Sequence, residues 1–150
     1  MIRDTKQGIK NLAKWFSIIW QDRDWDQSYL YEIIKFKLEQ MESYHREHGI
    51  TLNAYKYADQ MRVCVNLLDR LIKDDYAENA FKHHDKKWGD GRLTFNPKFS
   101  VEREKAITDK EKAQERKEWN RLYEHSDNLH KQDLDMLFTN MRKHIEGWWD

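Results

Sequence analysis

The sequence is poor in the residues that several protein classes require. Cys64 is its only cysteine, so a single chain can form neither an intramolecular disulfide nor a thiolate metal cluster. One proline, five glycines and three valines argue against a sheet-rich fold, because sheets favour β-branched residues and need frequent turns. The longest mostly apolar stretch, Trp15 to Trp20, is far shorter than the roughly 20 residues of a membrane span. We therefore expect a soluble, intracellular and mainly helical protein.

The sequence also lacks an excess of charge of either sign. Its 27 Lys and Arg residues are matched by 27 Asp and Glu residues, so no summed field attracts nucleic acid or anionic lipid. We therefore expect neither extended nucleic acid nor a membrane as a partner. The mean hydropathy of -1.08 is low enough for a disordered chain. However, seven Trp, seven Tyr and six Phe residues can each bury about 150–250 Å². These aromatic residues predict a thin core rich in aromatic rings.

Apolar residues recur at steps of three and four in four segments, which is the spacing of one face of an α-helix. These segments cover residues 9–20, 31–48, 54–72 and 134–148. Between residues 83 and 100 the period fails and glycines cluster with Asn96 and Pro97, which predicts an ordered loop near residues 85–100. The sequence thus predicts a single helical domain over residues 1–150, an all-α bundle of four to five helices.

Residues 101–118 are almost entirely charged, and the two signs alternate. This pattern predicts a solvated helix that is supported by pairs of opposite charge four residues apart. Thr108 and Glu111 have the spacing of a capping box, which would place a helix start inside the segment.

An acidic turn follows the first helical segment. Its carboxylates have the spacing of a calcium loop, but Gln27 and Ile33 stand where that loop needs Gly and Glu, so calcium is disfavoured. A carboxylate of the turn is expected to cap the next helix. The alternative is a ligand site in which an arginine pairs with a phosphate and a tryptophan stacks on a base. The candidate ligand-binding residues are Asp22, Arg23, Asp24, Trp25 and Asp26.

A second set of residues could bind a metal. His83, His84 and Asp85 resemble the His-Asp pair of helical metal phosphohydrolases, and Glu39 and Glu42 lie on the same side of one predicted helix. Adjacent histidines point about 100° apart on a helix, so at most one of them faces a given centre. We therefore favour histidines that are hydrogen-bonded or solvated, and we expect no metal or other cofactor.

The C-terminal Trp148 and Trp149 are a candidate interface. Trp148 continues the apolar face of the last helical segment and can equally be a packing residue. Trp149 points about 100° away, so it either covers a neighbouring helix or forms an exposed sticky surface.

Three motifs of the chain resemble a family of small proteins encoded in the genomes of tailed bacteriophages. They are WFSIIWQDRDWD at residues 15–26, YLYEIIKFKLE at residues 29–39 and WWD at residues 148–150. The family brings no established activity with it, so the resemblance transfers no catalytic residue. It implies a phage accessory protein that is made in the cytoplasm of the infected bacterial host.

These observations favour a non-enzymatic binding protein that acts on a host or phage component. In the phage context this action could counter host defence, either by contact with a protein or by sequestration of a small nucleotide. A homo-oligomer is compatible with the sequence. The alternative function is a metal-dependent nucleotide phosphohydrolase that uses the two histidines and three carboxylates named above.

Overall fold

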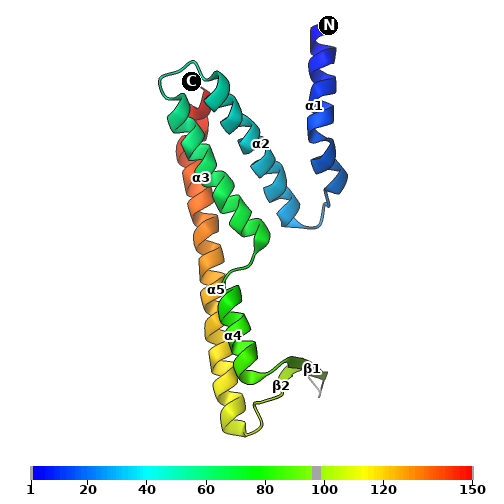
Figure 1. Ribbon diagram of the computed structural model, residues 1–150, viewed down its shortest axis with the longest axis vertical. Coiled ribbons are helices and arrows are strands. Elements are labelled where there is room, and N and C mark those ends of the chain that lie inside the picture. Colours follow the sequence, from blue (N-terminus) through cyan, green and yellow to red (C-terminus); the bar gives the residue numbers. More distant parts are fainter. Residues whose placement is uncertain (1, 96–98, 150) are drawn as a thin grey trace. The chain divides into compact units, whose positions relative to one another are not determined.

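The computed structural model describes residues 2–95 and 99–149. The elements are α1 (Ile2–Gln21), α2 (Gln27–His48), α3 (Ala54–Lys73), α4 (Glu78–Trp88), β1 (Gly91–Phe95), β2 (Phe99–Arg103), α5 (Asp109–His144) and a final 3-10 helix, η1 (Ile145–Trp149) (Figure 1). The predicted all-α class is confirmed, with a small two-stranded sheet added to the five α-helices of this part of the chain. No described helix is both long and apolar enough to cross a membrane.

The chain divides into two compact units, which are described separately. The first contains residues 1–73 and 134–150, and the second contains residues 74–133. Since α5 is one continuous helix that contributes residues to both units, the expectation of a single domain stays a prediction.

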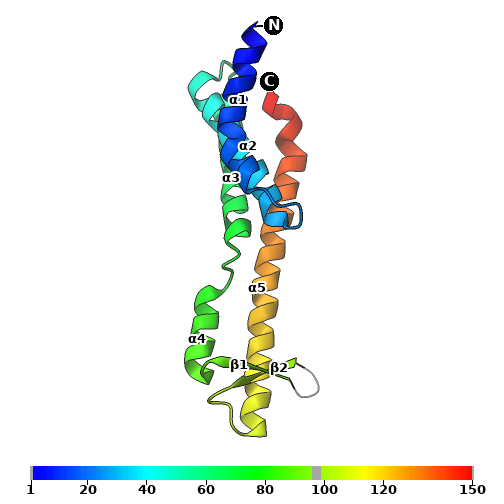
Figure 2. The same cartoon turned by 90° about the vertical axis from the view of Figure 1, so that its right-hand side faces the viewer.

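The first unit has its core between α2, α3 and the C-terminal part of α5. The apolar face that was predicted for residues 54–72 is the buried face of α3. Small residues at its start, Ala54 and Ala58, are fully buried, and the larger Met61 and Leu68 belong to one buried cluster with Leu137 of α5. Figures 1 and 2 show α2 between α1 and α3, so α1 lies outside this core. The three-helix core therefore forms without the apolar face of α1.

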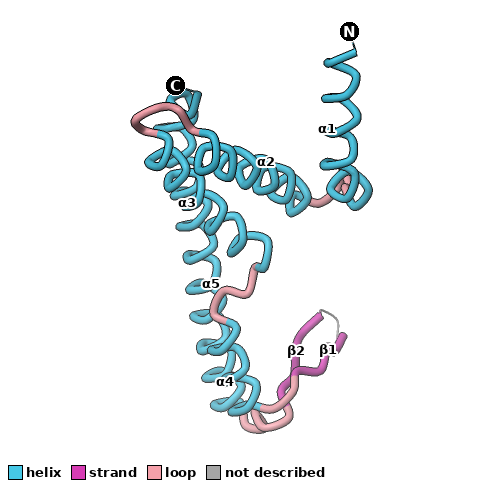
Figure 3. Tube along the Cα trace, turned by 45° about the horizontal axis from the view of Figure 1, so that its top comes forward, coloured by secondary structure: helices cyan, strands magenta, loops and turns pink. Residues whose placement is uncertain are grey.

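The second unit corrects the prediction of a loop near residues 85–100. Helix α4 continues to Trp88, and β1 and β2 form an antiparallel hairpin in which Gly91 pairs with Arg103 and Leu93 with Val101 (Figure 3). Apolar and polar residues do alternate in both strands, with Leu93 and Phe95 in β1 and Phe99 and Val101 in β2, but the glycines and Pro97 in the same segment favoured a loop. Asn96 and Pro97, which contributed to the loop prediction, lie outside the described residues.

The charged segment 101–118 is correspondingly not one helix. Its first residues belong to β2, and α5 begins at Asp109. The capping box is confirmed: the Thr108 backbone N–H donates to Glu111 Oε2 at 2.8 Å, and the Glu111 N–H donates to Thr108 Oγ1 at 3.3 Å. The Thr108 N–H and hydroxyl both donate to the Glu111 carboxylate, and these bonds lower the pKa of Glu111.

Candidate functional site

The turn between α1 and α2 acts as a pair of helix caps. Asp26 accepts a hydrogen bond from the Ser28 backbone N–H at 2.8 Å, so it is the N-cap of α2, as the sequence predicted. Arg23 Nη1 donates to the carbonyl oxygens of Asp22 at 2.7 Å and of Gln21 at 3.2 Å. These bonds satisfy free carbonyl groups at the end of α1 and place a positive charge where the helix dipole favours it.

The five candidate ligand-binding residues nevertheless surround one shallow hollow. Asp22, Arg23, Asp24, Trp25 and Asp26 all line it, together with Leu30 and Ile33 of α2. Trp25 is 80% exposed and is therefore accessible to a stacking partner. Arg23 uses one terminal nitrogen on the backbone, which leaves it less free to form the two-pronged contact with a phosphate. A nucleotide at this turn stays a prediction.

Helix α1 carries a row of exposed large apolar side chains. Five of its large apolar side chains are 62–73% exposed, and we call them the α1 face: Ile9, Leu12, Phe16, Ile19 and Trp20. Each residue advances about 100° around a helix, so these five share one side of α1. The Phe16 and Trp20 rings also stack on each other, with centroids 5.5 Å apart.

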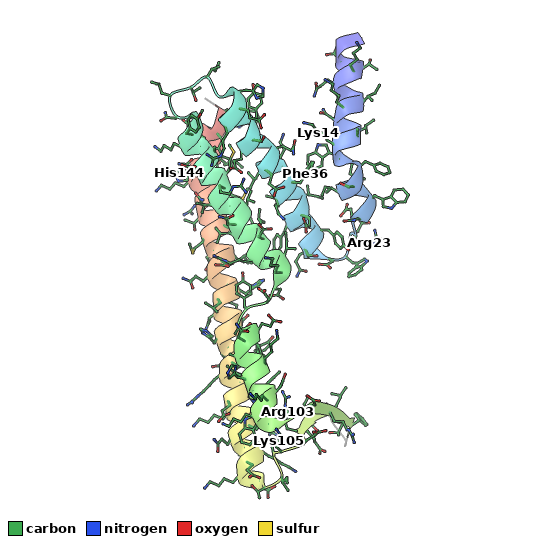
Figure 4. The ribbon with its side chains drawn as sticks, in the orientation of Figure 1. Lys14, Arg23, Phe36, Arg103, Lys105 and His144 are labelled. Carbon is green, nitrogen blue, oxygen red and sulfur yellow. The ribbon has the colours of Figure 1, made fainter. Side chains whose placement is uncertain are left out.

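A different side of α1 contacts α2. The ring of Trp15 packs edge-on against Phe36 of α2, with centroids 4.8 Å apart, and Lys14 Nζ donates to Gln40 Oε1 at 3.3 Å (Figure 4). Trp15 and Ile18, one or two positions from Phe16, are half-buried accordingly. The α1 face therefore points away from the helix that supports α1. The sequence showed this apolar face but not that the chain leaves it uncovered.

The charges around the α1 face are not evenly distributed. Within α1 the basic residues Arg3, Lys6, Lys10 and Lys14 outnumber the single acidic Asp4. The turn that follows the helix carries three aspartates within five residues. In a chain of zero formal net charge, this segment is thus basic along the helix and acidic just beyond its end.

Glu39 and Glu42, two candidate metal ligands, belong to α2 in the first unit. Glu42 is only 2% exposed and accepts hydrogen bonds from Arg46 Nε at 2.8 Å and from Arg62 Nε at 3.0 Å. Because Arg62 is on α3, this carboxylate joins the two helices. Its oxygens are engaged by cations of the chain itself, which is a structural role.

The other candidate metal ligands belong to α4 in the second unit. His83 is exposed, and its Nδ1 lies 3.0 Å from the Asn79 carbonyl oxygen. His84 is only 4% exposed, and neither ring nitrogen has a hydrogen-bond partner among the described residues. Asp85 accepts from Arg103 Nη1 at 2.6 Å. The described part of the chain contains no group of three or more His, Cys, Asp or Glu residues arranged to hold a metal.

Arg103 is the centre of a cluster in the second unit that the sequence did not reveal. Besides Asp85, its guanidinium contacts the Gly89 carbonyl oxygen at 3.2 Å and Glu115 Oε1 at 3.3 Å. It also lies over the Trp119 ring, 4.9 Å from the centroid. These partners come from α4, the residue that caps its C-terminus, and α5, 12 to 18 positions away in sequence, so no local spacing could have indicated them. The cluster anchors the hairpin to both helices.

The two C-terminal tryptophans have different environments. Trp148 is 1% exposed within the core, its Nε1 donates to Gln60 Oε1 at 3.0 Å, and its carbonyl oxygen lies 3.0 Å from His45 Nε2. Trp148 is thus a packing residue of the core, which is one of the two roles expected for it. Its assignment to an interface is corrected. Trp149 is 81% exposed, so it alone of the pair is accessible to a partner.

The fold and these side-chain arrangements were compared with known proteins. No family model, curated protein or solved structure matches this chain.

Proposed function

We propose that this chain is a non-enzymatic binding protein and that its binding element is the α1 face. The observation that supports this most is the direction of the face: five large apolar side chains of α1 are exposed, while α2 is contacted by Trp15 and Lys14. An amphipathic helix of this kind docks its apolar side against an apolar surface of a protein partner. The partner's identity as a host or phage component is the expectation from the resemblance to phage proteins.

The size of the α1 face supports a binding role. An aromatic side chain can bury about 150–250 Å², so Phe16 and Trp20 at their exposed fractions leave on the order of 200–350 Å² in water. Three aliphatic residues extend this area. The largest apolar patch of a typical monomer is about 300–600 Å² in total, and larger patches mark interaction sites. The α1 face is therefore of the size expected for a docking surface.

The way in which α1 is stabilised also supports a binding role. In proteins most of the stability of a helix comes from tertiary packing of its apolar face. The contacts of α1 with α2 include the Trp15–Phe36 ring contact and the Lys14–Gln40 hydrogen bond, whereas the five side chains of the α1 face stay exposed, so a partner on that face would add apolar burial to the helix. Binding and ordering of α1 are thus expected to be coupled.

Thiol accessibility tests whether the face is free. The experiment uses a Cys64→Ala background, with Leu12→Cys on the α1 face and Lys10→Cys on the polar side of the same helix as the matched control. At low protein concentration both thiols should react with Ellman's reagent at rates within about threefold of each other, because both positions are exposed. Strong protection of the Leu12→Cys thiol at every concentration would show that the chain covers its own α1 face, which contradicts the proposal.

A further inference from the structure

Four residues of the α1 face form a pattern of their own. Ile9, Leu12, Phe16 and Ile19 are spaced by three, four and three, which is the a and d pattern of two heptads. A seam of this kind packs by inserting its side chains between those of another helix with the same pattern. We propose that the protein that covers the α1 face is a second copy of this chain, with the two α1 helices antiparallel. This rests on the proposed function, because it names the partner of the same face.

Small residues border the seam on both edges. Gly8 and Ala13 lie beside it, and a Cβ built at Gly8 would have no heavy atom within 4 Å. Glycine inside a helix costs about 1 kcal/mol relative to alanine and here gains no contact within the chain. Small residues beside a seam allow the backbones of two helices to approach closely. The shape of α1 therefore suits a helical partner.

The distribution of charge selects the orientation. Lys6 and Lys10 are exposed in the first half of α1, whereas Asp22 and Asp24 are exposed just after its end. In an antiparallel pair, the basic half of each helix lies beside the acidic turn of the other copy, and opposite charges attract. A parallel pair would place like charges together.

The same charges disfavour a lipid surface as the occupant. A basic amphipathic helix with Trp and Phe on its apolar side is typical of membrane-surface binding. Here, however, the aspartates of the turn lie next to Trp20 and Trp25, the aromatic residues that would enter the lipid. Anionic headgroups would repel them. The acidic turn thus favours a partner with a complementary basic stretch, which α1 itself provides.

Analytical ultracentrifugation of the full chain, from about 1 to 200 μM, tests the association. The wild-type protein should shift from monomer to dimer over this range. Phe16→Asp places a charge in the centre of the seam and should weaken the dimer at least about tenfold. Ser17→Asp adds the same charge one position away, outside the seam, and should leave the dimer within about twofold. Far-UV circular dichroism at about 1 μM, where the wild type and both variants are monomeric, should be the same for all three chains, which shows that neither charge unfolds α1. A wild-type chain that stays monomeric, or equal weakening by both variants, would overturn the proposal.

Disulfide formation tests the orientation, in a Cys64→Ala background. If Ile9 of one copy packs against Ile19 of the other, two Ala13→Cys residues lie about 3 Å apart along the axis, and two Ile9→Cys residues about 15 Å apart. Because a disulfide requires Cα atoms within about 7 Å, Ala13→Cys should form the covalent dimer and Ile9→Cys should not. The reverse result, or a dimer that neither variant links, would overturn the antiparallel arrangement.

Failure of this inference can be distinguished from failure of the proposed function. A monomeric wild-type chain whose Leu12→Cys thiol reacts freely would refute self-association and leave the α1 face available to another protein. A monomer whose Leu12→Cys thiol is protected would refute both. Flotation with vesicles of phosphatidylglycerol is the third measurement: binding by monomeric wild-type protein that Phe16→Asp abolishes would assign the face to lipid and overturn the second-copy proposal.

Discussion

Replacement of Trp148 by alanine should destabilise the first unit strongly, whereas the same change at Trp149 should not. Trp148 is 1% exposed, and its indole N–H donates to Gln60 within the core. Loss of a buried tryptophan side chain costs about 3–5 kcal/mol, which combines lost apolar burial with the cavity that remains. Trp149 is 81% exposed, so its replacement should change the free energy of unfolding by no more than about 0.5 kcal/mol.

Urea unfolding followed by circular dichroism at 222 nm measures both variants against the wild type. If the m-value is unchanged, the difference in midpoint reports stability alone. In a chain of this size, 3–5 kcal/mol corresponds to a fall in Tm of about 6–20 °C. Trp148→Phe is an intermediate case, because the ring stays but Gln60 loses its donor, at a cost of about 1–3 kcal/mol. A Trp148→Ala variant within about 1 kcal/mol of the wild type, or equal effects at both positions, would refute the assignment of Trp148 to the core.

Three further predictions concern charged and ionisable groups. Glu42→Gln should lower the free energy of unfolding by about 1.5–3 kcal/mol, because a buried carboxylate that binds two arginines is lost. Chemical denaturation measures this change, and an unchanged midpoint would contradict the structural role of Glu42. The hydrogen bonds of Lys87 and Trp88 lower the pKa of Glu118 from 4.5 to about 2, so its contribution to stability is present above pH 4.5 and lost as the pH falls towards 2. The stability of Glu118→Gln should lack this dependence on pH, and acid unfolding identical to that of the wild type would refute the prediction. Burial raises the pKa of the Cys64 thiol to about 11, so Ellman's reagent should react with it only after unfolding in urea, and rapid reaction of the native protein at pH 8 would contradict its burial.

The sequence predicted those elements whose apolar residues recur with the period of the element and are buried in the fold. Helix α3 is the clearest case, because its apolar residues recur with a helical period and are buried between α2 and α5. The start of α5 was likewise indicated by its capping box. The hairpin was missed because the glycines and proline beside its two alternating segments favoured a loop, and because its anchor at Arg103 depends on side chains from two other elements. Contacts over such sequence separations leave no local signal.

For the candidate site, the sequence identified the segments but not their exposure. The spacing of the α1 residues shows that they share one face of a helix, yet a period is the same whether a core or solvent covers that face. Arg23 illustrates the same limit: a short polar turn with one arginine reads equally as a ligand site or as a helix cap, and its hydrogen bonds to two backbone carbonyls support the cap. Trp148 and Trp149 are adjacent in sequence, and only the packing of η1 distinguishes them.

The anchoring of the hairpin through Arg103 affects how its two strands acquire order. An isolated two-stranded sheet is marginally stable in water. Here the side chain at the end of β2 is held by a carboxylate on α4, a carboxylate on α5 and an indole ring, while Leu93 and Val101 in the middle of the strands are exposed. Arg103 thus anchors the strands to both helices at this end of the hairpin. The hydrogen bonds between the strands should therefore open together when α4 separates from α5, which makes the hairpin a local reporter of that helix pair.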